Sequence, residues 1–277
     1  MILNQIDMNI HGLPNAEALY DEPAVVGNLP AHIRDTVKIS ARKANEMTTF
    51  ALEKYGLTSD TNVPIVMDRI EPEEAGLVNG YTDGHKIGIN EYIVPHTNAF
   101  YSLTRRLGES RNPLAKYIYG KLSKPVDNLI RTIVHEKLHI ATQMKERDAS
   151  YGKTNFLNDL YGATVEYLSE KLPKAMKPMS KYIAGKIIVP MAEGLNESMT
   201  YEALGLKNNA EIRHAVRQEP TSYARFAEMA TDSLDCMGEP SPGQFYSGYF
   251  SQGYKKAREY VSGFFQSMGR RATPAMA

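Results

Sequence analysis

The chain has 277 residues, an apolar share of 42%, and 32 lysines and arginines balanced by 32 aspartates and glutamates. This composition can form a folded core, and the balanced charge excludes a global electrostatic attraction to nucleic acid or to a membrane. The single cysteine, Cys236, excludes an intrachain disulfide. The sequence has neither an apolar run of about 18 residues nor a secretory signal, so we expect a cytoplasmic protein without a membrane span.

The N-terminal part of the chain predicts an arm, a helix and a small mixed sheet. Residues 1–30 contain three prolines and are expected to form an extended arm. Apolar residues recur at helical spacing over 31–55, and Gly56 is a candidate cap for the end of that helix. Short segments rich in Val, Ile and Tyr then predict three strands, which this helix would back: 63–70, 76–82 and 86–93.

From residue 95 onward the pattern is mostly helical. Ser123, Pro125 and Asp127 predict the start of a helix, with a cap, an early proline and an acid in the first turn. Pro190 is expected to kink or break a later helix, and residues 238–243 to form a loop. The further predicted helices are 155–172, 176–205, 209–216, 220–236 and 251–267.

These elements predict a predominantly helical α+β fold. After the arm, we expect an N-terminal subdomain over 31–146, with the sheet and the helix that begins near 123. A helical C-terminal subdomain is expected over 147–277.

The strongest motif is His135-Glu136-Lys137-Leu138-His139, which has the form H-E-x-x-H. Residues four apart lie on one face of a helix, so His135 and His139 can bind one metal ion. Glu136 lies about 100° round the helix from His135, where it would flank the metal as a general base. Two histidines and a glutamate in an apolar helix are costly unless they are paired or bind metal. The motif therefore predicts a hydrolytic metal site that cleaves peptide bonds.

Two segments compete to supply a third metal ligand, since a catalytic zinc usually has three protein ligands and one open position. One contains Glu193 and Glu197, and the other contains Glu166 and Glu170. In each pair, one glutamate could bind the metal while the other hydrogen-bonds to a ligating histidine. The residues alone leave this choice open.

Together with the segment Glu193-Gly194-Leu195-Asn196-Glu197, the motif resembles the gluzincin class of zinc metallopeptidases. The resemblance covers roughly residues 31–205 and implies a zincin-like fold. It implies one Zn²⁺ per chain held by His135, His139 and Glu193. Glu197 would then support the ligands without binding the metal itself. The resemblance also implies Glu136 as the base and an edge strand that pairs with extended substrate, for which 86–93 is the best candidate.

One residue departs from the family pattern. Lys137 is charged where such helices usually carry an uncharged residue, and we expect its long stem to carry the ammonium group to the surface.

A group that stabilises the developing oxyanion is also needed for peptide hydrolysis. The sequence does not single one out. The candidates are His214, Tyr201, Tyr223, Tyr246 and Tyr249.

The expected partner is a peptide or protein substrate, and neither nucleic acid nor a membrane is expected. The alternatives are a helical binding or regulatory protein that keeps the metal without turnover, and a latent proenzyme whose arm covers the cleft.

Overall fold

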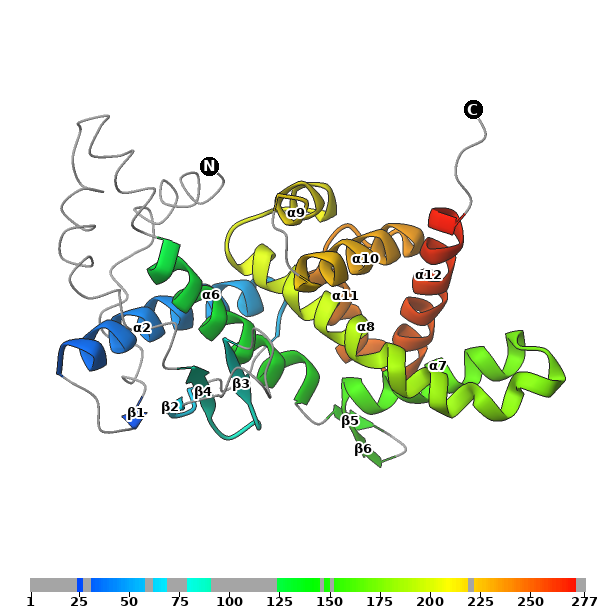
Figure 1. Ribbon diagram of the computed structural model, residues 1–277, viewed down its shortest axis with the longest axis horizontal. Helices are drawn as coiled ribbons and strands as arrows, with labels where there is room; N and C mark the ends of the chain where they lie inside the picture. Colours follow the sequence, from blue (N-terminus) through cyan, green and yellow to red (C-terminus); the bar gives the residue numbers. More distant parts are fainter. Residues whose placement is uncertain are drawn as a thin grey trace. The chain divides into compact units, whose positions relative to one another are not determined.

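The computed structural model describes residues 24–26, 31–57, 62–68, 79–90, 124–144, 147–149, 152–218 and 222–272. Over these residues the protein has the predicted α+β fold, mostly helical with a small mixed sheet (Figure 1). None of the described helices is long and apolar enough to cross a membrane. The chain divides into two compact units, Met1–Thr49 with Asp60–Lys137, and Phe50–Ser59 with Leu138–Ala277. The predicted helix start at Ser123 and most of the predicted arm lie outside the described residues.

The sheet of the first unit contains four strands in the order β1 (Val25–Val26), β2 (Ile65–Asp68), β4 (Ile87–Asn90) and β3 (Gly80–Thr82). β1 and β4 both pair parallel with β2, and β3 pairs antiparallel with β4. The predicted substrate-binding edge at 86–93 is therefore wrong for β4, which has a neighbour on each side. Its Ile-Gly-Ile run is buried because the strand is central in this sheet.

Glycines allow close contacts on the sheet. The Tyr81 ring lies over Gly88, where an added Cβ would come within 2.1 Å of the ring, and the Tyr81 hydroxyl donates to Asp68 Oδ2 at 2.7 Å. The side chain of Tyr81 thus links three neighbouring strands. Gly80 lies close to Thr132, whose Cγ2 would be 2.7 Å from an added Cβ, so the helix that carries Thr132 packs on β3.

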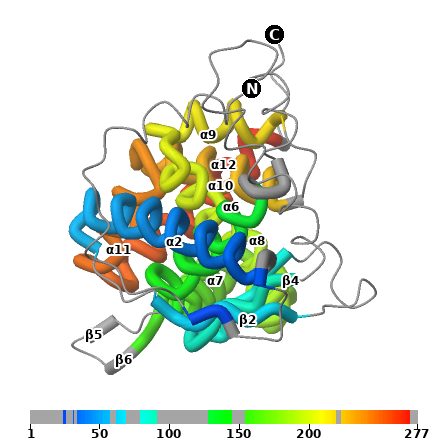
Figure 2. The backbone as a smooth tube through the Cα atoms, turned by 90° about the vertical axis from the view of Figure 1, so that its left-hand side faces the viewer, coloured from blue at the N-terminus to red at the C-terminus, as the bar shows by residue number. Residues whose placement is uncertain are grey.

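The predicted first helix is α2 (Ala31–Lys54), and Figures 1 and 2 both show it beside the strands. Val37, Ala41, Ala44 and Thr48 form a buried stripe at helical spacing. Gly56 has φ +68 at the end of the helix, a conformation that glycine adopts without a Cβ penalty, so the predicted cap is confirmed.

The second unit is helical, apart from a short hairpin of β5 (Arg147–Ala149) and β6 (Gly152–Thr154). α8 packs between α7 and α10, and α12 packs on α10 and α7. The helices, with the 3₁₀ segment η4, are α7 (Phe156–Lys171), η4 (Lys174–Met179), α8 (Ser180–Ala203), α9 (Asn209–Val216), α10 (Ser222–Met237), α11 (Pro242–Gln252) and α12 (Tyr254–Ala272).

Two predictions for this unit are contradicted at least in part. α8 continues through Pro190, so the helix is not broken there. The predicted loop at 238–243 ends early, because α11 begins at Pro242. Ser241 caps α11 by accepting from the backbone N–H of Gln244, and proline is favoured in the first turn. Ser241 and Pro242, which were expected in the loop, therefore form the start of a helix.

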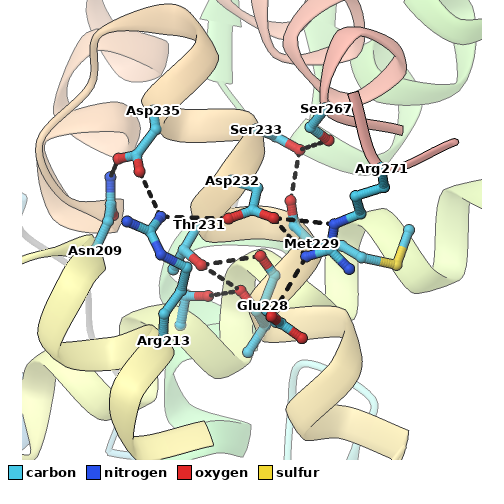
Figure 3. Close-up of polar contacts among 12 residues, drawn as sticks. Asn209, Arg213, Glu228, Met229, Thr231, Asp232, Ser233, Asp235, Ser267 and Arg271 are labelled. Atoms are coloured by element: carbon cyan, nitrogen blue, oxygen red, sulfur yellow. Dashed lines mark hydrogen bonds and ion pairs between the residues drawn. The ribbon is translucent and has the colours of Figure 1, made fainter. Parts of the chain in front are cut away.

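A row of acids on α10 joins it to the helices on either side (Figure 3). Arg213 of α9 bonds to Asp232 and Asp235, and Arg271 of α12 bonds to Asp232 and Glu228. Each exposed ion pair alone contributes little to the stability of the fold, but pairs that share residues in a network restrain one another's side chains. The network joins α9, α10 and α12, and α10 in turn packs on α8.

Candidate metal centre

The motif lies on a buried helix that changes its winding within the motif itself. α6 (Lys124–Leu138) carries His135 and Glu136, and the π-helical turn η3 (His139–Met144) continues the chain and carries His139. Leu129, Ile133 and Val134 are fully buried. Because apolar residues occupy most of its circumference, this helix is buried, as predicted.

Lys137 differs from the expectation. Its side chain is fully buried, so the ammonium group does not reach the surface. The neighbouring residues Glu136 and Leu138 are buried as well, so this part of α6 offers the lysine stem no path to the surface.

Glu193 lies on the buried half of α8, from Met191 to Ala203. Next to it, Gly194 lies against α10, where an added Cβ would be 2.2 Å from the Phe226 carbonyl oxygen. Ser198 strengthens the same contact, because its hydroxyl lies within hydrogen-bonding distance of the carbonyl oxygens of Gly194 and Ala227. Close packing of α8 on α10 therefore fixes the position of the helix that presents Glu193.

Among the described residues, one group of acids and histidines is compact enough to hold a metal ion, and it consists of His135, His139 and Glu193. One potential ligand atom from each residue lies within 4.8 Å of the other two. His139 is buried, while His135 and Glu193 are partly exposed. The motif and the acid from the favoured later segment thus meet in space.

The distance between two of the potential ligand atoms fits a tetrahedrally coordinated metal ion. His139 Nε2 and Glu193 Oε2 are 3.3 Å apart. Ligands about 2.0–2.1 Å from a zinc ion at its centre define a tetrahedron with edges of about 3.3–3.4 Å. Two imidazoles and one carboxylate are also a donor set that suits zinc. The residues present therefore fit the ion that the motif predicts.

The other ring nitrogen of His139 is held by a buried amide. His139 Nδ1 and Gln143 Oε1 are 2.9 Å apart, and Gln143 Nε2 donates to the Ala192 carbonyl oxygen at 2.8 Å and to the Tyr246 hydroxyl at 3.2 Å. Both Gln143 and Tyr246 are almost wholly buried. The sequence analysis did not single out Gln143. Its position four residues after His139 could have indicated the contact, because residues four apart on a helix are neighbours.

The competing acid, Glu166, has other partners. Its carboxylate accepts from the Tyr254 hydroxyl at 2.9 Å and lies 3.4 Å from Arg258. Burial of its phenol, followed by the hydrogen bond to Glu166, raises the pKa of Tyr254 to about 12. Glu166 therefore belongs to a contact between α7 and α12 in the described structure.

The remaining candidates are spread over several helices. Glu197 is buried one turn after Glu193. His214 is exposed on α9, Tyr201 is buried near the end of α8, and Tyr223 lies at the start of α10. Tyr249 donates to Asp159 Oδ2 at 2.8 Å in a buried pair.

Tyr246 is joined to His139 through Gln143. Its burial raises the pKa of the phenol well above the usual value, and the charge of Glu193 acts in the same direction. The hydroxyl is therefore protonated at neutral pH.

Comparisons with protein-family models, with curated proteins and with solved structures give no match to this chain. The likeness to gluzincins thus depends on the residues of the site.

Proposed function

We propose that this protein is a zinc-dependent peptidase of gluzincin type, with His135, His139 and Glu193 as the metal ligands. The observation that carries the proposal is the grouping of the two motif histidines with a glutamate from a separate helix, with potential ligand atoms within 4.8 Å of one another and one pair, His139 and Glu193, 3.3 Å apart. An H-E-x-x-H sequence that arose by chance does not require a carboxylate from another helix beside its histidines, so the position of Glu193 supports a metal site.

Glu136 is the proposed general base. A zinc ion at this site would lower the pKa of a water molecule to about 7. Glu136 follows His135 directly and is buried, so its carboxylate can take a proton from the attacking water and deliver it to the leaving amine. A partner for the carbonyl oxygen is still required, and we keep His214, Tyr201 and Tyr223 as candidates for it.

Metal content is the first test of this proposal. Protein purified without added metal, or dialysed against zinc, should contain about one zinc per chain by elemental analysis. Removal of the metal with a chelator should abolish cleavage of unfolded protein substrates, and zinc should restore it. Folded protein that takes up no zinc would overturn the proposed site.

Substitution of the base separates catalysis from metal binding. Glu136→Gln should keep the zinc and reduce the rate of peptide cleavage by about a hundredfold or more, because a general base has been lost. Glu170→Gln is the control, since Glu170 is an exposed acid on α7 and should leave the rate unchanged. A metal-loaded wild-type protein without peptidase activity would instead favour a binding or regulatory role.

A further inference from the structure

Gln143 has a single allowed amide orientation. Its Nε2 atom faces the Ala192 carbonyl oxygen, which can only accept a hydrogen bond, at 2.8 Å. The opposite orientation would place two acceptor oxygens 2.8 Å apart with no hydrogen between them. The second Nε2 hydrogen is directed to the Tyr246 hydroxyl, so Oε1 remains as the atom that faces His139.

This orientation determines which nitrogen of His139 carries the hydrogen. Oε1 of an amide is an acceptor, so Nδ1 of His139 must be the donor across the 2.9 Å contact. In the neutral imidazole the lone pair then lies on Nε2, the atom that is 3.3 Å from Glu193. Nε2 is therefore the nitrogen prepared to bind a metal.

Gln143 lies on the same helical turn as the ring that it contacts. His139 begins the π-helical turn and Gln143 lies within it. Residues four apart on one helix are neighbours, so the amide is within reach of the imidazole. A π turn inside an α-helix frequently marks a functional site.

Gln143 also links the two segments that carry ligands. Its amide donates to Ala192, the residue directly before Glu193. One side chain therefore orients the ring of His139 and fixes the backbone from which Glu193 extends. The Tyr246 hydroxyl accepts the remaining hydrogen of the Gln143 amide.

We propose that Gln143 is a positioning residue that sets His139 in the Nδ1–H tautomer and aligns it with Glu193, with Tyr246 holding the amide in place. This assigns Tyr246 to the support of a ligand and not to contact with the substrate. The inference rests on the proposed metal site, but its central claim concerns the tautomer and can be measured without metal.

The tautomer is the first measurement, and it is made in metal-free Glu193→Ala, because the Glu193 carboxylate 3.3 Å from Nε2 would itself favour a hydrogen on that nitrogen. Long-range proton–nitrogen NMR of ¹⁵N-histidine protein should show His139 as the Nδ1–H form at a pH where the ring is neutral. Adding Gln143→Leu should remove this preference, because leucine offers no acceptor to Nδ1. A hydrogen on Nε2 in Glu193→Ala would overturn the proposal.

Zinc affinity is the second measurement. Loss of a group that orients a ligand typically weakens a metal site by about 10–100-fold, and we expect this for Gln143→Leu in competition with a chelator. Tyr246→Phe is the intermediate variant, because it removes one of the two acceptors that hold the amide but keeps the contacts of Gln143 with His139 and Ala192. It should weaken zinc binding, and by less than Gln143→Leu.

These outcomes distinguish the two proposals. An Nδ1–H tautomer in Glu193→Ala, together with wild-type protein that binds no zinc, would overturn the proposed function alone. Zinc binding that is equal in wild type and Gln143→Leu, with circular dichroism showing both to be folded, would overturn the role of Gln143 alone.

Discussion

The surroundings of single carboxylates favour Glu193 over Glu166 as the third proposed ligand. Glu193 lies 3.3 Å from His139, whereas Glu166 is bonded to Tyr254 and Arg258. We expect Glu193→Ala to lose zinc during dialysis. Removal of a metal ligand should lower zinc affinity by far more than the 10–100-fold typical of removing a group that only hydrogen-bonds to a ligand. Elemental analysis after dialysis measures the loss.

Glu166→Ala serves as the comparison for this prediction. It removes an acid from a partly exposed contact on α7 and should leave the zinc content at one per chain. Zinc that is lost from Glu166→Ala but kept in Glu193→Ala would move the site to α7.

At the scale of the element, the glycine of the Glu193-Gly194 pair serves the packing of two helices. A Cβ at Gly194 would lie 2.2 Å from a backbone oxygen of α10, which cannot move aside like a flexible side chain. Gly194→Ala should therefore lower the free energy of unfolding by about 1–3 kcal/mol or more, as overpacking does. Urea unfolding followed by circular dichroism measures this change.

The same helix offers a matched control. Gly185 is exposed, and nothing lies within 4 Å of a Cβ added there. Gly185→Ala should raise stability by up to about 1 kcal/mol, because alanine favours a helix over glycine. Equal effects at the two positions would show that the close approach of α8 to α10 is absent in solution.

At the scale of the whole molecule, a neutral total charge conceals an uneven distribution. Residues 171–192 contain five lysines and no acid, whereas the full chain is balanced at 32 and 32. All five lysines are exposed around η4 and the first half of α8: Lys171, Lys174, Lys177, Lys181 and Lys186. A local cluster of one sign creates a field that net charge does not reveal.

Ion-exchange chromatography would detect this cluster. Near pH 7.1, where the sequence predicts no net charge, the protein should still be retained on a cation exchanger. The triple variant Lys174→Gln, Lys177→Gln, Lys181→Gln should elute at lower salt than the control triple Lys207→Gln, Lys255→Gln, Arg270→Gln. The two variants have the same total charge, so equal elution would contradict a localised field.

The sequence by itself determined the features that depend on local geometry. The spacing of His135 and His139 places both on one helical face whatever the rest of the chain does, because helix geometry is local. Apolar periodicity located α2 and most helices of the second unit, and Gly56 marked the end of α2. These features need only a few neighbouring residues to form.

Only the tertiary structure decided which distant groups meet. Glu193 and Glu166 have equivalent local patterns, and packing brought Glu193 to His139 while Glu166 joined Arg258. The central place of β4 and the burial of Lys137 also depend on neighbours from elsewhere in the chain. Gln143 acquires its role from Ala192 and Tyr246 in the same way. The physical reason is that side-chain contacts between separate elements depend on how those elements pack, which a local pattern does not specify.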